Sequence, residues 1–313
     1  MEKINLGNSD LKVSRLCFGG CPMGGHGWGD VSKNELIVAI QKAVEIGVNF
    51  FDSADVYGLG EGEKTLGEAL KGKRDKAVIA TKFGVRVENG ITFYDNSPKW
   101  INSAVRASLE RLNTDYIDLY QVHYRDSLIP IGDVINELEK LKSIGFIKHY
   151  GLSNIHQKDL EELKHFKGKF VSFQDEFSLV TRKNEHDMIV LSSELDMTPL
   201  TWGSLGQGIL TGKYDRNTKF DKNDRRSREI YENFHGEKLI RNLEIVDVLK
   251  DISSRLNKPV SAIAIRWILD YLPNSVVIAG IKNSNQLLGN SAALNWHLSD
   301  HDKMLLCDIS KGD

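Results

Sequence analysis

Short apolar runs alternate with amphipathic stretches along nearly the whole chain. The apolar runs have the length of buried strands and cover residues 15–19, 49–52, 77–81, 117–121, 149–152, 170–174, 198–202 and 275–280. Apolar residues recur at helical spacing in between, over 32–46, 63–71, 98–112, 131–144, 157–166, 185–195, 237–271 and 283–293. Eight strand–helix units of this kind predict an α/β fold, a single (β/α)8 TIM barrel.

Local signals support these elements. Ser32 with Glu35 fits a capping box at a helix start, and glycines follow three of the predicted helices at 47, 72 and 145. Residues 3–13 form a candidate β-hairpin that turns at 7–10. No change of composition or Pro/Gly-rich linker divides the chain, so one domain over 1–313 is expected.

Two long segments interrupt the pattern, 83–97 after the third strand and 203–236 after the seventh. Loops of this length in a compact domain are usually functional or disordered. Both follow strand ends, so we expect both on the face of the barrel that carries catalysis.

A doubly wound sheet with two domains is the alternative fold, and the glycine-rich turn 58–62 is its best support. A dinucleotide fingerprint needs a glycine at its sixth position and an acidic residue at the next strand end. Glu63 and Lys82 stand there instead. The glycines are therefore interpreted as shaping a tight turn.

Composition narrows the function classes. The chain has 41 Lys plus Arg and 43 Asp plus Glu, so its charge gives no reason to expect nucleic acid or an anionic membrane as a partner. No apolar run reaches a membrane span, and the amino terminus lacks a signal peptide's apolar stretch. Three cysteines do not form a disulfide framework, which favours a cytoplasmic location.

A metal site is not predicted. Cys17 and Cys21 have the spacing of half a zinc site, but nothing supplies a second pair, although His26 lies nearby. Cys17, within an apolar run, is better explained as a small buried hydrophobe. Cys21 falls at a strand end, where a role in lining a site stays open.

Four polar side chains sit at or just after strand ends: Asp52, Tyr57, Lys82 and His123. In a barrel these ends converge on one face. Each residue alone has an ordinary structural explanation, but four together indicate a site that donates a proton and suits reduction of a carbonyl. Lys82 would lower the tyrosine pKa, Asp52 would keep Lys82 charged, and His123 would orient the carbonyl oxygen.

Five motifs, three of which contain these residues, resemble those of the aldo/keto reductase family. They are Phe51-Asp52-Ser53-Ala54-Asp55-Val56-Tyr57-Gly58, Thr81-Lys82-Phe83-Gly84, Asp118-Leu119-Tyr120-Gln121-Val122-His123, Gly151-Leu152-Ser153-Asn154 and Gly208-Ile209-Leu210-Thr211-Gly212-Lys213-Tyr214. The resemblance runs from the hairpin to about residue 298 and is strongest to the bacterial NADPH-dependent branch related to potassium-channel β subunits. It implies Tyr57 as the general acid and Asp52, Lys82 and His123 as the rest of a catalytic tetrad.

The resemblance also implies where NADPH or NADP⁺ would bind. The nicotinamide would lie against Ser153, Asn154, Gln174 and Trp202, and the pyrophosphate along the backbone from Gly203 to Gln207. The full predicted set of cofactor-binding residues is Gly20, Cys21, Asp52, Ser153, Asn154, Gln174, Trp202, Gly203, Ser204, Leu205, Gly206, Gln207, Lys213, Arg226, Gly280, Ile281, Lys282, Gln286 and Asn290.

Some residues depart from the family pattern. Trp202 replaces a usual tyrosine, and Gln207 replaces an arginine for which Lys213 and Arg226 could compensate. Lys282 replaces an arginine at the 2′-phosphate, which keeps the charge but loses the bidentate fork. NADPH is still preferred over NADH.

The predicted substrate is a small carbonyl compound in a pocket formed by Trp28, Tyr57 and His123. Arg125 would either face the pocket mouth and favour acidic or phosphorylated substrates, or pair with Asp126 on the surface. A redox sensor that binds NADPH with little turnover is the alternative function. A barrel glycosidase would leave Lys82 and Trp202 without a role. The physiological substrate and the oligomeric state are not predicted.

Overall fold

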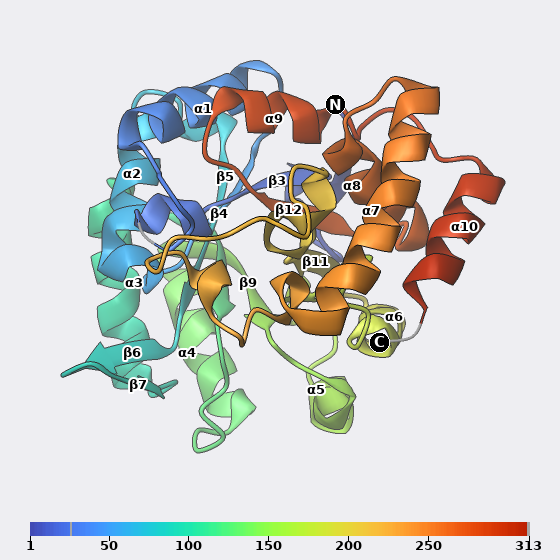
Figure 1. Cartoon of the computed structure of the whole chain (residues 1–313). Helices are drawn as coiled ribbons and strands as arrows, with labels where there is room; N and C mark the ends of the chain where they lie inside the picture. The colour runs from blue at the N-terminus through green and yellow to red at the C-terminus, as the bar shows by residue number, and fades with distance from the viewer. Residues whose placement is uncertain (26, 312–313) are drawn as a thin grey trace.

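A closed barrel of eight parallel strands forms the centre of the computed structural model, which describes residues 1–25 and 27–311 (Figure 1). Around the barrel the strands follow their order in the chain, and β12 pairs with β3 to close it. The TIM barrel predicted from the alternation of strands and helices is therefore confirmed. The barrel strands are β3 (Leu16–Gly19), β4 (Phe50–Asp52), β5 (Val78–Phe83), β8 (Ile117–Val122), β9 (Ile147–Ser153), β10 (Ser172–Glu176), β11 (Thr198–Trp202) and β12 (Val276–Gly280).

Helices surround the barrel and connect successive strands (Figure 1). Ser32 accepts a hydrogen bond from the backbone N–H of Glu35, as its capping motif predicts. The α-helices are α1 (Lys33–Glu45), α2 (Glu61–Ala69), α3 (Pro98–Leu112), α4 (Ile131–Ser143), α5 (Leu160–Lys164), α6 (Glu185–Leu195), α7 (Gly236–Leu256), α8 (Val260–Tyr271), α9 (Ser284–Ser291) and α10 (Asp300–Ser310).

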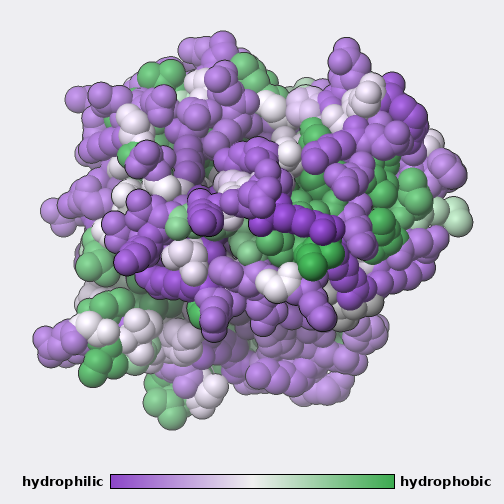
Figure 2. All heavy atoms as spheres, viewed as in Figure 1, coloured by the Kyte–Doolittle hydropathy of each residue, from purple (hydrophilic) through white to green (hydrophobic). Residues whose placement is uncertain are grey.

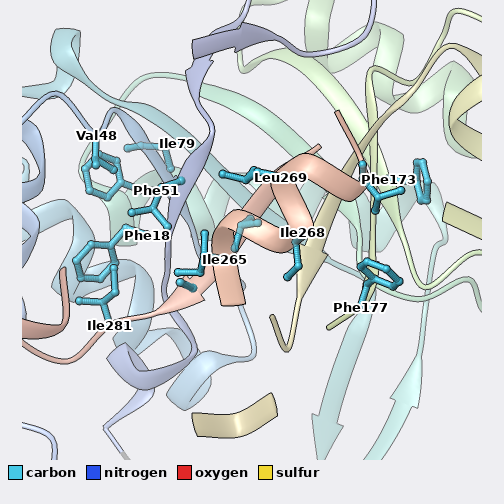
Figure 3. Close-up of a cluster of buried hydrophobic side chains, with 14 of the residues drawn as sticks. Phe18, Val48, Phe51, Ile79, Phe173, Phe177, Ile265, Ile268, Leu269 and Ile281 are labelled. Carbon is cyan, nitrogen blue, oxygen red and sulfur yellow. The ribbon is translucent and has the colours of Figure 1, made fainter. Parts of the chain in front are cut away.

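Successive strand residues face two different cores, as the period of two in a strand requires. Cys17 and Phe50 point into the barrel with Leu119 and Leu200, whereas Phe18 and Phe51 pack outward against the helices. Figure 3 shows α8 between two groups of these outward side chains, with Phe18 and Phe51 on one side and Phe173 and Phe177 on the other. Burial raises the pKa of the Cys17 thiol well above its usual range, so Cys17 acts as a core hydrophobe.

The amino-terminal hairpin is present as β1 (Lys3–Asn5) and β2 (Lys12–Ser14). Leu6, Leu11 and Val13 belong to the same buried cluster as the side chains inside the barrel. The hairpin therefore closes the end of the barrel opposite the polar strand ends.

Three parts of the chain differ from the sequence-based expectation. Residues 83–97 contain a second hairpin, formed by β6 (Val85–Glu88) and β7 (Ile91–Tyr94). The helical region 237–271 divides into α7 and α8, because Asn257 adopts a left-handed conformation and Pro259 follows it. The terminal helix α10 was not predicted.

The segment after β11 crosses over the barrel face (Figure 1). It contains the 3-10 helices η5 (Gly206–Thr211), η6 (Arg225–Ser227) and η7 (Glu232–Phe234). Polar side chains cover much of the face seen in Figure 2. None of the described helices is both long enough and apolar enough to span a membrane.

Candidate functional site

The structure brings the four predicted catalytic side chains together at the carboxyl ends of the strands. Asp52 ends β4, Lys82 is the penultimate residue of β5, and His123 directly follows β8. Tyr57 begins the 3-10 helix η2 (Tyr57–Gly60), which follows β4. The Tyr57 and His123 rings lie edge to face with centroids 6.1 Å apart.

Lys82 is the centre of this cluster. Its buried Nζ donates to Asp52 Oδ2 at 2.6 Å, to the carbonyl oxygen of Ser53 at 2.9 Å and to the Tyr57 hydroxyl at 3.3 Å. An ammonium has three donors, so all of them have acceptors. The lysine side chain is 1% exposed and that of Asp52 is 3% exposed, which makes this a buried ion pair.

A tight turn presents Tyr57 to the cluster. Gly58, Leu59 and Gly60 all have positive φ, at 60°, 52° and 99°. A Cβ on Gly58 would lie 2.5 Å from the carbonyl oxygen of Gly24, so glycine is required there for the close approach of the two loops. The glycine-rich segment therefore shapes the turn after β4, as the sequence analysis expected.

Two amides hold the second oxygen of Asp52. Gln174 Nε2 donates to Asp52 Oδ1 at 2.5 Å, and Gln121 Nε2 lies 3.3 Å from the same atom. Gln121 was not singled out from the sequence. It lies two residues before His123 on one strand, so the period of two places both side chains on the same face.

The pKa of the Tyr57 hydroxyl lies above its usual range in this structure, rather than below it as expected from Lys82 alone. Burial raises the pKa of the Tyr57 hydroxyl well above its usual range, and the negative charge of Asp52 adds to the increase. The Asp52 carboxylate lies 2.6 Å from the lysine ammonium. Its negative charge therefore cancels much of the electrostatic effect that Lys82 would have on the Tyr57 hydroxyl. The isolated protein therefore holds Tyr57 protonated, ready to donate rather than to accept a proton.

His123 is neutral at physiological pH. Burial lowers its pKa well below the usual range, and repulsion from Lys82 lowers it further. Its Nδ1 is buried and has no hydrogen-bond partner among the described residues. A neutral imidazole can donate one hydrogen bond without adding a charge.

A second carboxyl, that of half-buried Asp55, lies in the same motif. Burial raises the pKa of Asp55 to about 8, and repulsion from Glu63 contributes. The folded protein then holds a proton that the unfolded chain releases above its reference value of 3.8. This contribution to stability is present at low pH and is lost as the pH rises towards 8.

We therefore expect Asp55→Asn to flatten the pH dependence of stability. Asp55 should lower the free energy of unfolding by up to about 1.4 kcal/mol for each pH unit between pH 5 and 8. Urea unfolding at pH 5.5, 6.5 and 7.5 measures this slope, with the exposed Asp75→Asn as the control. Equal slopes in wild type and Asp55→Asn would contradict the assigned pKa.

Amide and hydroxyl groups gather beside the tetrad at the ends of β9 and β10. Asn154 Nδ2 donates to the His123 carbonyl oxygen at 2.9 Å and to Ser153 Oγ at 3.1 Å. The amide nitrogen of Gln174 donates hydrogen bonds to the side chains of Asp52 and Gln121. The side-chain oxygens of Asn154 and Gln174 accept no hydrogen bond from the described residues, so they can receive the N–H groups of a carboxamide. Half-buried Trp202 ends the neighbouring β11.

The turn after Trp202 offers backbone donors. The N–H groups of Ser204 and Leu205 make no hydrogen bond within the described part of the chain, whereas that of Gly206 donates to the Gly203 carbonyl at 2.7 Å. The Ser204 hydroxyl is turned inward and donates to Thr201 O at 2.7 Å. Only part of the predicted 203–207 backbone is therefore available to an anion.

Three cationic side chains converge near this turn: Lys213 and Arg226 lie farther along the same segment, and Lys282 lies between β12 and α9. Burial lowers the pKa of Lys282, and repulsion from Arg226 and Lys213 lowers it further. A Cβ on Gly29 would lie within 3.6 Å of both Lys282 Nζ and Arg226 Nη2, which places these two groups close together. Such crowding of like charges suits a bound anion, and a nucleotide phosphate fits it.

A carboxylate already occupies part of this cluster. Asp224 Oδ1 accepts from Arg226 Nε at 2.8 Å, and Asp224 Oδ2 lies 2.5 Å from Arg226 Nη2. Both residues are buried. Asp224 was not predicted as part of the site, because four basic residues lie within four positions of it in the sequence. The sequence does not reveal which of them it neutralises.

The remaining predicted cofactor residues lie around these groups. Gln286 Oε1 accepts from the backbone N–H of Lys282 at 2.9 Å, and Gln286 lies in the first turn of α9 with buried Asn290 near its end. Gly280 ends β12 beside Gly19, and Ile281 is buried. Gly20 donates its N–H to the Asp52 carbonyl at 2.7 Å, so it approaches the tetrad through its backbone.

Trp28 joins two loops over the site. Its Nε1 donates to Cys21 Sγ at 3.3 Å, its ring meets Tyr231 edge to face at 5.8 Å, and its carbonyl oxygen accepts from Lys282 Nζ. Burial raises the pKa of the Cys21 thiol, which makes this cysteine a weak nucleophile. A role for Trp28 in the substrate pocket stays a prediction. His26 lies outside the described residues.

A cavity of about 740 Å³ adjoins the tetrad, with Asn154 and Trp202 in its wall. Tyr124 also lines it, and the Tyr124 ring stacks on His123 at 5.1 Å. Arg125 faces this cavity and pairs with Asp159 and Glu162, so the expected pairing with Asp126 is wrong. Asp126 instead accepts backbone N–H groups, including that of Asn96 at 2.7 Å.

No group of three or more His, Cys, Asp or Glu side chains among the described residues is arranged to hold a metal ion. The polar groups of the site instead consist of an ion pair, amides and backbone donors.

Comparison with known proteins assigns the chain and its fold to one family. Residues 15–309 match a sequence model of the Aldo/keto reductase family. The Bacillus subtilis protein named Aldo-keto reductase YhdN is 31% identical over 308 residues, which cover 97% of this chain and 92% of that protein. The Escherichia coli NADH-specific methylglyoxal reductase is 30% identical and covers 99% of both chains.

A solved structure agrees with these sequence matches. The glycerol dehydrogenase AKR11B4 from Gluconobacter oxydans superposes with a TM-score of 0.88 at 31% identity, covering 98% of this chain and 94% of that one. The resemblance inferred from the motifs is thus confirmed across nearly the whole chain.

Proposed function

Since the chain belongs to the aldo/keto reductase family and is an oxidoreductase, we propose that it reduces an aldehyde or ketone to an alcohol, reversibly, with NADPH. The observation that carries this proposal is the buried Lys82 ammonium, which donates one hydrogen bond to Asp52 and another to the Tyr57 hydroxyl. Bound NADPH supplies the hydride that the carbonyl carbon receives.

The protein's own part is to handle the proton. Tyr57 carries a proton because burial and Asp52 oppose its ionisation, and it gives that proton to the carbonyl oxygen. The phenolate that remains is stabilised by the Lys82 ammonium at 3.3 Å. Neutral His123 orients the carbonyl oxygen by a hydrogen bond.

The groups beside the tetrad suit a nicotinamide nucleotide. The side-chain oxygens of Asn154 and Gln174 would hold its carboxamide, with Ser153 next to them, and Trp202 would stack on its ring. The free N–H groups of Ser204 and Leu205 would meet its pyrophosphate.

The cluster of Lys213, Arg226 and Lys282 supports NADPH over NADH. The 2′-phosphate, which only NADPH carries, would supply a negative charge to balance these cations. Asp224 weakens this preference by neutralising Arg226. One relative is named as NADH-specific, so the preference must be measured on this chain.

Lys282→Ala is expected to lower the ratio of kcat/KM with NADPH to kcat/KM with NADH by roughly 10-fold or more. The reason is that the substitution would remove one charge-assisted hydrogen bond to the 2′-phosphate. Measuring both cofactors against one aldehyde gives this ratio. Lys303→Ala, on α10, is the control. An unchanged ratio in Lys282→Ala would exclude Lys282 as the 2′-phosphate contact.

Steady-state turnover tests the function itself. Purified protein with NADPH is offered butanal, glyceraldehyde and methylglyoxal, and NADPH oxidation and alcohol formation are followed together. The proposal expects many turnovers per protein molecule with at least one of these. Tight NADPH binding without repeated turnover would instead support the redox-sensor alternative.

A further inference from the structure

Asp224 places a negative charge inside the cluster of cations that would meet the nucleotide phosphate. A Cβ on Gly29 would lie 3.4 Å from Asp224 Oδ2, 3.5 Å from Lys282 Nζ and 3.6 Å from Arg226 Nη2. The three charged groups therefore surround one small space beside the Gly29 backbone. The Asp224 side chain is 5% exposed and that of Arg226 is 9% exposed, so salt screens this pair only weakly.

Each nitrogen of the Arg226 guanidinium already has an acceptor. Nε donates to Asp224 Oδ1 at 2.8 Å, and Nη2 lies 2.5 Å from Asp224 Oδ2. This is the two-pronged arrangement that a guanidinium otherwise offers to a phosphate. The third nitrogen, Nη1, donates to the Tyr214 hydroxyl. A phosphate that binds Arg226 through both prongs must therefore displace the Asp224 carboxylate.

The same contacts leave the Asp224 carboxylate able to accept from a hydroxyl. Arg226 supplies three donors to it: the two side-chain nitrogens and the backbone N–H, which lies 3.0 Å from Oδ1. An ionised carboxylate has about four acceptor sites, so one is left. In nucleotide sites a carboxylate of this kind accepts from the ribose 2′-hydroxyl of NADH, whereas a nearby arginine accommodates a 2′-phosphate. Asp224 and Arg226 therefore suit different cofactors.

We propose that Asp224 is a specificity residue that narrows the preference for NADPH over NADH. This inference rests on the proposed function, in which the cluster around Arg226 and Lys282 meets the adenosine ribose. With NADPH, the carboxylate repels the 2′-phosphate and competes with it for Arg226. With NADH, the carboxylate accepts a hydrogen bond from the free 2′-hydroxyl. The protein should therefore use both cofactors.

Two variants remove the charge of Asp224 while keeping its local structural role. Its side chain caps η6 by accepting the backbone N–H of Arg226, and both Asn and Ser can replace Asp as a helix cap. Asp224→Asn and Asp224→Ser are therefore expected to fold. The control is Asp221→Asn, which removes the charge of an exposed aspartate earlier in the same segment.

Binding of two nucleotide fragments tests the proposal without turnover. Adenosine 2′,5′-bisphosphate and adenosine 5′-monophosphate differ only by the 2′-phosphate, and calorimetric titration gives the Kd of each. The affinity for the bisphosphate relative to the monophosphate should rise roughly 10-fold in both Asp224 variants, because Arg226 becomes free to make a charge-assisted contact. Asp221→Asn should keep the wild-type ratio.

Steady-state kinetics with one aldehyde gives the second measurement. The wild type should oxidise NADH as well as NADPH. In both Asp224 variants the ratio of kcat/KM with NADPH to kcat/KM with NADH should rise roughly 10-fold, in line with the change in nucleotide affinity. The change should lie in the KM values of the two cofactors and leave kcat unaltered, because the substitution is made at the adenosine end of the site.

The outcomes separate this inference from the reductase function. An unchanged ratio of nucleotide affinities in both variants, or no binding of either nucleotide to the wild type, overturns the proposal. A lower ratio also overturns it, since Asp224 would then orient Arg226 for the phosphate. If the ratio rises but no carbonyl compound is reduced, the role of Asp224 stands and the proposed reaction fails. If aldehydes are reduced and the ratio is unchanged, the role of Asp224 fails alone.

Discussion

Tyr57→Phe is expected to lower kcat by roughly 10²- to 10⁴-fold, the contribution of a positioned general acid. Among the described residues, the substitution removes the only hydroxyl that bonds Lys82 Nζ, and it leaves the ring in place against His123. NADPH should bind with an unchanged Kd, since no predicted cofactor contact is lost. Stopped-flow or steady-state turnover with butanal gives kcat, and fluorescence titration gives the Kd.

Tyr94→Phe is the matched control, because it removes one hydroxyl from the outer hairpin strand β7. It should keep wild-type kcat. Substantial turnover in Tyr57→Phe would show that another group supplies the proton. A loss of NADPH binding in that variant would instead point to a structural effect of the substitution.

Asp52→Ala is expected to destabilise the protein by about 3–5 kcal/mol. Lys82 is 1% exposed, and within the described part of the chain its 2.6 Å contact to Asp52 is the only bond it makes to a carboxylate. Removing Asp52 would leave an unpaired charge in the barrel interior. Urea unfolding of the wild type and the variant measures the difference in the free energy of unfolding.

Two further variants show whether the buried charge is the cause. Asp300→Ala removes a carboxylate that is 91% exposed and should change stability by less than about 1 kcal/mol. Asp52→Ala/Lys82→Met removes both charges and should recover part of the lost stability. A double variant no more stable than Asp52→Ala would show that packing, rather than the unpaired ammonium, accounts for the loss.

The barrel and its tetrad were predictable because their signals are local. Apolar runs of strand length alternate with helical periodicity, and a closed parallel barrel places every strand end on one face. Asp52, Lys82 and His123 could therefore be grouped before any contact was known. The hairpin over 83–97 also had a signal that was not used, since Asn89-Gly90 lies between two alternating apolar–polar runs.

Features that depend on long-range pairing could not be predicted in the same way. The pKa of Tyr57 follows from burial and from Asp52 offsetting Lys82, which requires all three positions in space. Arg125 pairs with Asp159 and Glu162 on a neighbouring loop rather than with Asp126 next to it.

Hydride transfer from NADPH that carries deuterium at both C4 positions tests the central claim most directly. A single turnover with butanal, analysed by mass spectrometry, locates the deuterium. The account predicts butanol that carries one deuterium on its alcohol carbon, with the hydroxyl proton drawn from Tyr57. Butanol without deuterium at that carbon, or oxidation of NADPH with no butanol formed, would contradict direct hydride transfer at this site.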